Sequence, residues 1–535
     1  MTTTSEERAD KERRGDERRP GELNARELGR WVWRQLTSMR TALMLLLLLA
    51  LAAIPGSVIP QEDVDSLAVT RWKTDHPKLA PWYEKLDLFS VYSSPWFSAV
   101  YLLLVLSLVG CIVPRLLVYY RGMRAQPPAA PRHLSRMPVQ ASYSTTLSAD
   151  EVLAHARTVL GRRHRLRKAG DGDDYVAAER GYLREAGNLV FHLSLLIVLA
   201  GVAMGGLWGY QGGVIIVEGK SFSNNLTQYD DFKPGGLFRQ DQMADFRFTV
   251  DKFSVSWLKS GPKAGQAREF DAALSYRIGE GPTKKYDLRV NHPLKLDGTD
   301  VFLIGHGYAP VITVRDSKGQ VVTTGPTVFL PQDASFLSYG VVKAQAASPQ
   351  LGFDGFFYPT FDMVNGNPVT VFGDDLLPTL SMLAWTGDLG YDNGASQSVY
   401  VLDKAKATQV KKKDGKPFRL DLQVGDTVKL PDGLGSVTFD GVQPWIRVQI
   451  SQTPGKEIAL IGVILALIGL CASLFIRPRR VWVRAVPADA VPGAEGTMNG
   501  TGETRVEIAV LDRSGNGDMD EVLAGLLAQL QEARQ

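Results

Sequence analysis

The sequence predicts an integral membrane α-helical protein with four transmembrane helices, a large β-rich extracytoplasmic domain and a small α+β cytoplasmic unit. Three observations support this fold class: four apolar stretches, arginines gathered on one side of them, and one long polar segment. The stretches cover residues 39–60, 97–119, 189–208 and 458–476. Each is close to the ~20 residues that a helix needs to cross a bilayer. Only helices and closed barrels satisfy their backbone hydrogen bonds in lipid, so we interpret the stretches as helices.

The charges beside these stretches predict the orientation. Arginines precede the first and third stretches and follow the second and fourth, as at Arg34, Arg121, Arg184 and Arg479. By the positive-inside rule, both termini and residues 120–188 are expected in the cytoplasm. The outer loop 61–96 and the domain 209–457 are then outside. A cleavable signal peptide is not favoured, because about forty residues, many of them charged, precede the first stretch. The predicted location is the cytoplasmic membrane, crossed several times.

Composition excludes several function classes. The net charge of +3 over 535 residues gives no reason to expect a nucleic-acid partner. The two cysteines, Cys111 and Cys471, both lie in apolar stretches, so the polar domain is expected to have no disulfide. CxxC, P-loop, HExxH and GxSxG motifs are absent, and no catalytic residue or metal site is assigned.

The cytoplasmic segments carry weaker patterns. Residues 1–38 are expected to be disordered, since the first 25 are charged and almost free of large apolar side chains. Ser148 and Glu151 form a candidate capping box for a helix through about Leu160. Leu166–Lys168 and Tyr175–Ala178 indicate a hairpin. The tail 477–535 contains an apolar-basic run at Val481–Arg484, a Gly-rich linker near 493–502 and an amphipathic helix at Met519–Ala533. That helix either docks on a partner or stays solvated.

The polar domain is expected to be rich in strands. Strand-like segments with alternating or β-branched patterns are Phe246–Trp257, Ala272–Arg277, Val301–Ile304, Val311–Arg315, Ser398–Leu402 and Ser436–Phe439. Turn dipeptides are Asp297–Gly298, Asn365–Gly366, Asn393–Gly394, Asp414–Gly415 and Asp432–Gly433. These patterns favour a sandwich or an open barrel, with two lobes as one arrangement. Residues 331–385 are expected to be less regular.

Histidine is the residue type best suited to carry chemistry here. Of seven histidines, His76, His133, His155 and His164 are expected at the solvated surface. His192 lies inside the third apolar stretch, where an ionisable group is costly and functional by default. Neutral imidazole is a common axial ligand of haem iron. The alternative is an interfacial histidine hydrogen-bonded to a neighbouring helix.

His306 is the second candidate. It is expected at the end of a strand, between Gly305 and Gly307, where glycines would permit close approach of a ligand. The alternative, for His306 and for His292, is a structural histidine in a turn. A separate stripe of glycines at four-residue spacing (Gly201, Gly205 and Gly209) permits close packing. Packing within this chain is favoured over a partner-specific face.

Several short motifs together resemble a known family. They are Ser38–Ala42, Ile54–Gln61, Ser94–Phe97, Cys111–Arg115, Glu179–Tyr182, Phe191–Leu196 and Gly305–Pro310. In this order, with four predicted spans and a large outer domain, they resemble the ResB family of system II cytochrome c maturation proteins. The resemblance covers about Arg34–Trp482. The N-terminal tail and the region after about Ala485 are expected to lie outside it.

The resemblance implies a role in haem delivery. The family acts with a CcsA/ResC-type membrane protein whose tryptophan-rich segment handles haem. The complex presents reduced haem to the CxxCH thiols of apocytochrome c. This chain has no such segment, which fits a two-protein system. His192 and His306 match positions that look like family histidines, so haem binding by both is a hypothesis. Ser93 stands where some relatives have histidine. Bond formation would be shared with the partner, so no enzymatic activity is assigned to this chain alone.

Two other function classes stay open. A membrane-anchored sensor or scaffold with a ligand-binding β domain would make His192 and His306 dispensable for any haem phenotype. A transporter subunit would place polar residues along several helices. The four apolar stretches contain few of these, so this reading ranks last.

Overall fold

The computed structural model describes residues 24–532, with gaps at 63, 65, 171, 262–264, 392–398, 488–502 and 513–517. The expected disorder of residues 1–23, the Asn393–Gly394 turn and the Gly-rich linker near 493–502 lie outside the described residues. The chain forms two compact units. Unit 1 contains Met1–Ala200 and Glu457–Gln535, and unit 2 contains Gly201–Lys456.

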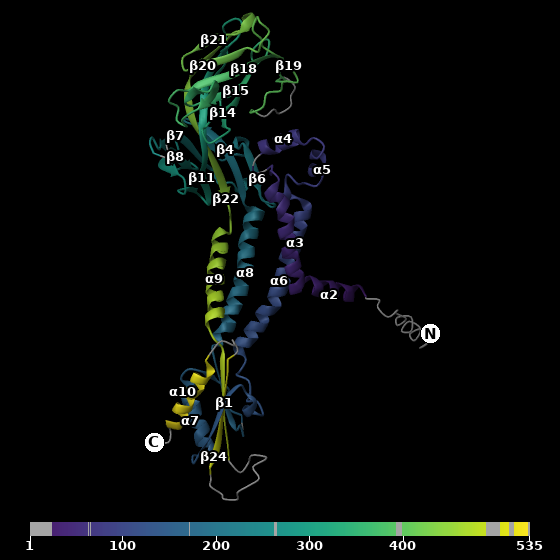
Figure 1. Cartoon of the computed structure of the whole chain (residues 1–535), viewed down its shortest axis with the longest axis vertical. Helices are drawn as coiled ribbons and strands as arrows, with labels where there is room; N and C mark the ends of the chain where they lie inside the picture. Colours follow the sequence, from purple (N-terminus) through teal and green to yellow (C-terminus); the bar gives the residue numbers. More distant parts are fainter. Residues whose placement is uncertain are drawn as a thin grey trace, which may run out of the picture. The chain divides into compact units, whose positions relative to one another are not determined.

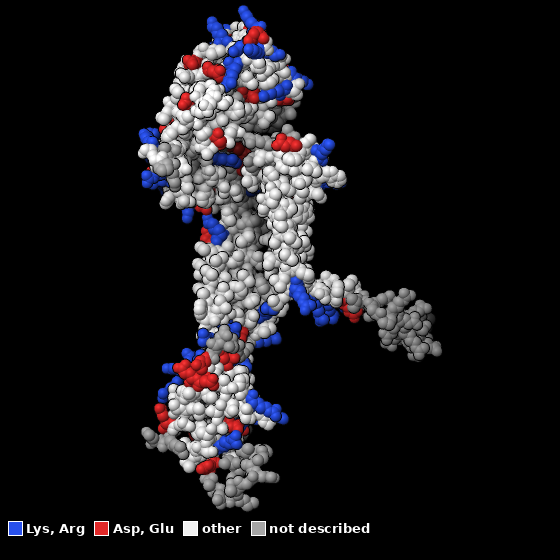
Figure 2. All heavy atoms as spheres, in the orientation of Figure 1, with Lys and Arg blue, Asp and Glu red and all other residues white. Residues whose placement is uncertain are grey.

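In the part of the chain that the structure describes, four helices are long and apolar enough to cross a membrane, which makes this a membrane protein. They are α3 (Met39–Val58), α6 (Pro95–Arg124), α8 (Leu183–Trp208) and α9 (Lys456–Phe475) (Figure 1). The surface over α3 and α6 is almost free of charged atoms in Figure 2, as contact with lipid requires. The prediction of four helices is confirmed. α6 begins two residues earlier than expected, because Ser94 caps it and Pro95 occupies its first turn.

Unit 1 has further helices and short helical turns besides α3 and α6. They are α2 (Ala25–Leu36), α4 (Ser66–Asp75), α5 (Ala80–Lys85) and the 3₁₀ turns η1 (Val91–Ser93) and η2 (Leu134–Arg136). α2 lies within the segment expected to be disordered, and that prediction is wrong for residues 25–36. The Glu27 carboxylate accepts a hydrogen bond from the Asn24 backbone N–H at 2.9 Å, which supports the start of the helix.

Two segments separated by almost 300 residues build one antiparallel sheet in unit 1. Its strands are β1 (Val139–Thr145), β2 (Arg165–Leu166), β3 (Tyr175–Arg180), β23 (Arg479–Pro487) and β24 (Thr504–Asp512), in the order β1-β24-β23-β3-β2. Apolar side chains of α7 (Ala149–Gly161) and α10 (Met519–Gln531) share a buried core with the sheet. The Ser148–Glu151 capping box and the β2–β3 hairpin are confirmed.

The tail therefore differs from expectation. Val481–Arg484 lies inside β23, and α10 packs through Leu523 and Leu530 onto the chain's own sheet. The prediction of a solvated or partner-bound helix is wrong. Each tail segment gives a weak signal alone, because its apolar face is covered by α7 and by strands from the distant 120–188 segment.

Unit 2 consists of antiparallel sheets. The strands are β4 (Tyr210–Val217), β5 (Ser221–Ser223), β6 (Asp231–Pro234), β7 (Phe246–Trp257), β8 (Ala267–Ile278), β9 (Lys284–Arg289), β10 (Leu294–Leu296), β11 (Thr299–Arg315), β12 (Val321–Pro326), β13 (Leu330–Pro331), β14 (Ser338–Ala344), β15 (Leu351–Tyr358), β16 (Phe361–Val364), β17 (Asn367–Thr370), β18 (Thr379–Asp388), β19 (Lys406–Gln409), β20 (Arg419–Gln423), β21 (Thr427–Lys429) and β22 (Ser436–Gln452). Short 3₁₀ turns are η3 (Leu226–Gln228), η4 (Gln240–Gln242) and η5 (Pro431–Gly433). The main sheets have the orders β10-β11-β22-β4-β6, β13-β14-β15-β18-β19 and β5-β7-β8-β9.

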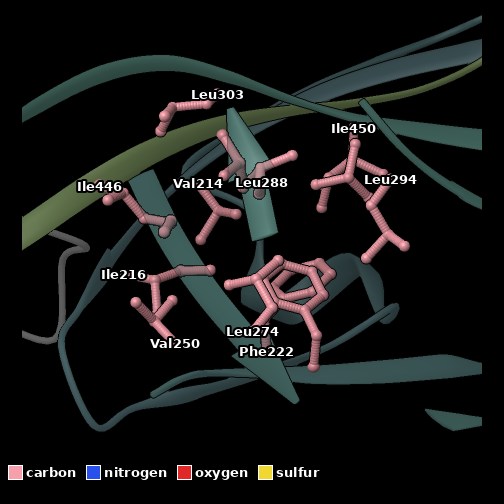
Figure 3. Close-up of a cluster of buried hydrophobic side chains, with 14 of the residues drawn as sticks. Val214, Ile216, Phe222, Val250, Leu274, Leu288, Leu294, Leu303, Ile446 and Ile450 are labelled. Carbon is pink, nitrogen blue, oxygen red and sulfur yellow. The ribbon is translucent and has the colours of Figure 1, made fainter. Parts of the chain in front are cut away.

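Two hydrophobic cores divide unit 2 into two lobes. The first lobe, β4–β10, buries the cluster drawn in Figure 3, which includes Phe222 and Leu288. The second lobe, β12–β21, is built around Phe353 and Phe439. The 17-residue strands β11 and β22 pair along their length and contribute side chains to both cores. The β-rich prediction is confirmed, and this shared ribbon joins the lobes.

Some strand predictions need correction. Val301–Ile304 and Val311–Arg315 are parts of the single strand β11. Most of residues 331–385, expected to be less regular, lie in the strands β14–β18, although 345–350 and 371–378 are turns and loops. Gly340 makes room for an aromatic ring within the sheet. A Cβ on Gly340 would lie 2.3 Å from Cδ2 of Phe329. Residues 399–402 form no strand. Both residues of Asp297–Gly298 and of Asn365–Gly366 have positive φ, so these predicted turns are confirmed.

Candidate functional site: the His306 pocket and His192

His306 lies in the middle of β11, where the two lobes meet. It pairs with Ile446 of β22, between Leu303 of the first core and Tyr308 of the second. A register shift between Leu303 and Gly305 leaves Ile304 unpaired. The expectation that the strand ends at His306 is wrong, and so is the alternative of a histidine in a turn.

Four aromatic rings from both lobes surround the His306 imidazole. Phe336 stacks on it with ring centroids 4.5 Å apart, and Phe270, Phe253 and Trp257 lie at 5.1, 5.4 and 6.3 Å. Phe253 and Trp257 come from β7 and Phe270 from β8. The site therefore has apolar walls from widely separated parts of the sequence.

The loop between β13 and β14 positions the stacked ring. Phe336 has a φ of 64°, a left-handed conformation that is unusual for a bulky residue. Its backbone N–H donates to the Asp333 carbonyl at 3.2 Å. The Asp333 carboxylate accepts from the Ser335 N–H and hydroxyl at 2.9 and 2.6 Å. The loop thus stabilises Phe336 in the conformation that covers His306.

The imidazole is neutral at physiological pH. Burial lowers the pKa of His306 to about 4, because the charged form loses its hydration. Nε2 is buried and has no hydrogen-bond partner among the described residues. A buried polar atom without a partner is rare in folded proteins. In the tautomer that carries its proton on Nδ1, Nε2 has a lone pair that can coordinate a metal centre.

A pocket of about 440 Å³ adjoins His306. Phe253, Phe270, Leu303 and Phe336 contribute to its apolar lining, and Asp333 is the charged residue among the described lining residues. This volume lies within the range of small-molecule and cofactor sites. The pocket is suited to a largely apolar ligand with one group, such as a metal centre, that the imidazole nitrogen can coordinate.

The glycines beside His306 were predicted to permit close approach of a ligand, but their surroundings indicate a different role. A Cβ on Gly307 would lie 2.3 Å from Cζ2 of Trp445, whose Nε1 donates to the carbonyls of Tyr308 and Phe329 at 3.0 and 3.2 Å. A Cβ on Gly305 would meet only Cβ of Arg447, at 3.5 Å. Gly307 thus accommodates a buried tryptophan, and neither glycine has positive φ.

His192 lies in α8 within unit 1. Its Nδ1 donates to the Asn188 carbonyl one turn earlier at 2.8 Å, which leaves the lone pair on Nε2. The ring packs against Tyr119 of α6, with centroids 5.3 Å apart. The contact with α9 is made by the neighbouring side chain: Oδ1 of Asn188 accepts a hydrogen bond from the Ser473 hydroxyl at 2.8 Å. The hydrogen bond of His192 stays within its own helix.

The remaining histidines do not form a second site. His292 is exposed and forms an isolated bridge with Arg289. Nε2 of His155 lies 3.2 Å from the Gln529 carbonyl, which links α7 to α10. His164 is partly buried, against the expectation of a solvated side chain, and burial lowers its pKa. Within the described ranges, no three His, Cys, Asp or Glu residues are grouped to hold a metal ion.

Glycines also determine how α8 packs. A Cβ on Gly205 would lie 3.0 Å from Cγ2 of Thr453, and one on Gly209 would lie 2.6 Å from the Gln452 carbonyl oxygen. Packing of this stripe within the chain is confirmed. The sequence analysis missed the buried Gly462 and Gly469 of α9, which face α8; a Cβ on Gly469 would lie 2.5 Å from the Phe191 backbone nitrogen. The seven-residue spacing of these two glycines is the sequence pattern that could have identified them.

Comparison with known proteins gives one consistent family. Residues 39–524 match the ResB-like family. The match extends past Ala485 into α10, which corrects the expected end of the resemblance. A cytochrome c biogenesis protein CcsB of Synechococcus sp. strain WH7803 is 28% identical over 349 residues, covering 64% of this chain and 74% of the relative. Proteins of the same name from Synechococcus sp. strain CC9311 and Thermosynechococcus vestitus are 28% and 26% identical. These matches cover 53% and 52% of this chain and 61% and 60% of the relatives.

Proposed function

The chain belongs to the ResB-like family, and we propose from this that it is a cytochrome c biogenesis protein, a subunit of a system II cytochrome c synthase complex. In this role it helps deliver haem across the membrane and presents it with apocytochrome c for thioether attachment at CxxCH. The relatives named CcsB support the pathway. The His306 pocket is the observation that supports haem as the cargo.

The residues around His306 fit part of a haem. Nε2 of His306 would be the nitrogen that holds the iron, because it is neutral, buried and without a hydrogen-bond partner among the described residues. Phe253, Phe270 and Phe336 would contact the macrocycle, since aromatic walls suit a flat apolar ring. Haem would bring the iron and the vinyl groups that react with thiols.

The pocket does not supply everything that haem needs. No lysine or arginine is among the described residues that line it. The two propionate carboxylates would therefore contact solvent or a partner protein. This incomplete site agrees with a subunit that shares haem with a CcsA/ResC-type membrane protein. It also agrees with assigning bond formation to the complex, and not to this chain alone.

His192 is proposed as a second haem contact. Its Nε2 keeps the lone pair because Nδ1 donates within α8. We place both termini in the cytoplasm and unit 2 outside, in line with the arginines near the ends of α3, α6 and α9. Haem would then contact His192 within the membrane unit and His306 outside.

A haem stain of covalent cytochrome c tests this function. Cells lacking the gene would be supplied with wild type, His192→Ala, His306→Ala or the exposed control His292→Ala. Deletion is expected to abolish the stained bands, and wild type and His292→Ala to restore them. Failure of stably expressed His306→Ala would assign that residue to haem. Persistence of the bands after deletion would reject the proposal.

A membrane-anchored sensor or scaffold is the second candidate. The absence of a cation among the described pocket residues favours it, because a neutral apolar ligand would need none. In that case the purified wild-type protein would gain no haem absorbance that His306→Ala loses. The spectra of the two purified proteins therefore separate the candidates.

A further inference from the structure

We propose that α2 lies in the membrane interface and binds anionic phospholipid headgroups through Arg26, Arg30 and Arg34. The proposal is independent of haem and of the family. It concerns the twelve residues Ala25–Leu36, directly before the first membrane helix.

The three arginines form one stripe. They are four residues apart, so their side chains project from the same side of the helix. Together with Gly29 and Trp33 they line a shallow groove. A Cβ on Gly29 would meet nothing within 4 Å, so the groove is open between the arginines. In Figure 2 basic atoms gather along one edge of α2. The guanidinium groups can thus contact phosphate oxygens together.

The opposite side of α2 is apolar and uncovered. Leu28 and Val32 are each 48% exposed, and no described residue of the helix is buried. Trp31 and Trp33, 53% and 51% exposed, lie on the two flanks between the apolar side and the arginines. Tryptophan prefers the membrane–water interface, and a basic amphipathic helix with this arrangement lies in its plane.

The junction with α3 holds α2 at the membrane boundary. The Thr41 hydroxyl donates to the Gln35 carbonyl at 2.6 Å, and the Ser107 hydroxyl of α6 donates to the Leu36 carbonyl at 2.5 Å. A Cβ on Gly110 of α6 would lie 2.1 Å from Cγ2 of Thr37. Only Thr37 and Ser38 separate α2 from α3. α2 therefore turns away from α3 at a packed corner (Figure 1).

Lipid is the occupant that accounts for both faces. A soluble acidic partner would bind the arginines and leave Leu28 and Val32 in water. Anionic headgroups complement the arginine stripe, and the underlying acyl region accepts the apolar side. Because only two residues separate α2 from α3, the headgroup layer already lies beside α2.

Hydrogen exchange of the full-length protein in lipid nanodiscs tests the proposal. Amides of residues 25–36 would be compared in phosphatidylcholine alone and in phosphatidylcholine with phosphatidylglycerol. Each basic residue near an anionic surface contributes a factor of about five. Exchange is therefore expected to slow by at least about tenfold in the anionic discs. At ~1 M salt, where the Debye length is only ~3 Å, the difference should disappear.

A triple variant, R26Q/R30Q/R34Q, should lose the lipid dependence. Substituting three exposed arginines elsewhere in unit 1, R136Q/R162Q/R163Q, provides the matched control and should keep it. Equal exchange of the wild type in both lipids would overturn the proposal, whether or not the variants fold. So would a triple variant that keeps the wild-type difference, and a protein partner would then be the occupant to seek.

Discussion

Acidification should loosen the ribbon of β11 and β22 through one side chain. His306 has a pKa of about 4 in the folded protein, against ~6.5 for an exposed histidine. Its folded pKa is lowered, so the unfolded state binds the proton more tightly. The stabilisation is complete above pH ~6.5 and is lost as the pH falls from there towards 4.

The magnitude follows from these two pKa values. Between pH 7 and pH 4.5, proton uptake by the opened state should lower the stability of this region by about 2.5 kcal/mol. This corresponds to a roughly 60-fold loss of hydrogen-exchange protection. His306→Leu replaces the imidazole with an apolar side chain that cannot be protonated. The variant should keep its protection over the same range.

Hydrogen exchange of the full-length protein measures the effect. Peptides covering 299–315 and 436–452 would be followed at both pH values, with correction for intrinsic exchange rates. The exposed His292→Leu is the control and should behave like wild type. The reasoning fails if wild type and His306→Leu lose the same protection on acidification.

Three further predictions concern packing. Gly307→Ala should destabilise unit 2 by about 1–3 kcal/mol, because the new Cβ collides with Trp445. Gly305→Ala should change stability by less than about 0.5 kcal/mol in the same chemical unfolding experiment. Gly469→Leu should separate α8 from α9 and reduce the monodisperse fraction in size-exclusion chromatography, whereas Gly206→Leu, with nothing within 4 Å, should not. Truncation after Pro487 removes β24 and α10, so hydrogen exchange should show loss of protection in β1 and β23.

Each of these has a clear contrary outcome. Equal destabilisation by Gly305→Ala and Gly307→Ala would mean that glycine flexibility matters there, and not the tryptophan. Equal size-exclusion profiles for Gly469→Leu and Gly206→Leu would mean that the close packing of α8 on α9 at Gly469 is not required for a folded protein. Persistent protection of β1 after truncation would mean that its strand pairing is not required.

The structural features that depend on residues close together in the sequence were predicted correctly. Hydropathy identified the four membrane helices, and the Ser148–Glu151 spacing identified the start of α7. The alternation in Phe246–Trp257 gave the bounds of β7. In each case the signal lies within one turn, one strand or one run of apolar residues. Such local patterns remain visible without the tertiary structure.

The sequence could not predict contacts between distant segments. It singled out His306 but not the rings of Phe253, Phe270 and Phe336, which reach it from three separate places in the chain. Val481–Arg484 was too short to identify as a strand, because its partners are Tyr175–Arg180 and Thr504–Asp512. Gly307 was interpreted as a turn residue. The side chain that requires a glycine there, the indole of Trp445, lies 138 positions away in the sequence.

The split sheet of unit 1 also has a consequence for biosynthesis. Among the described strands, β24 is the one that pairs with β1, so β1 waits for this partner until the ribosome has added more than 300 further residues. At ~5–20 residues per second, the interval lasts roughly 15 to 70 seconds. During that time the apolar side of α7 lacks much of the surface that later covers it. The nascent chain therefore completes this domain only after β24 and α10 have been synthesised.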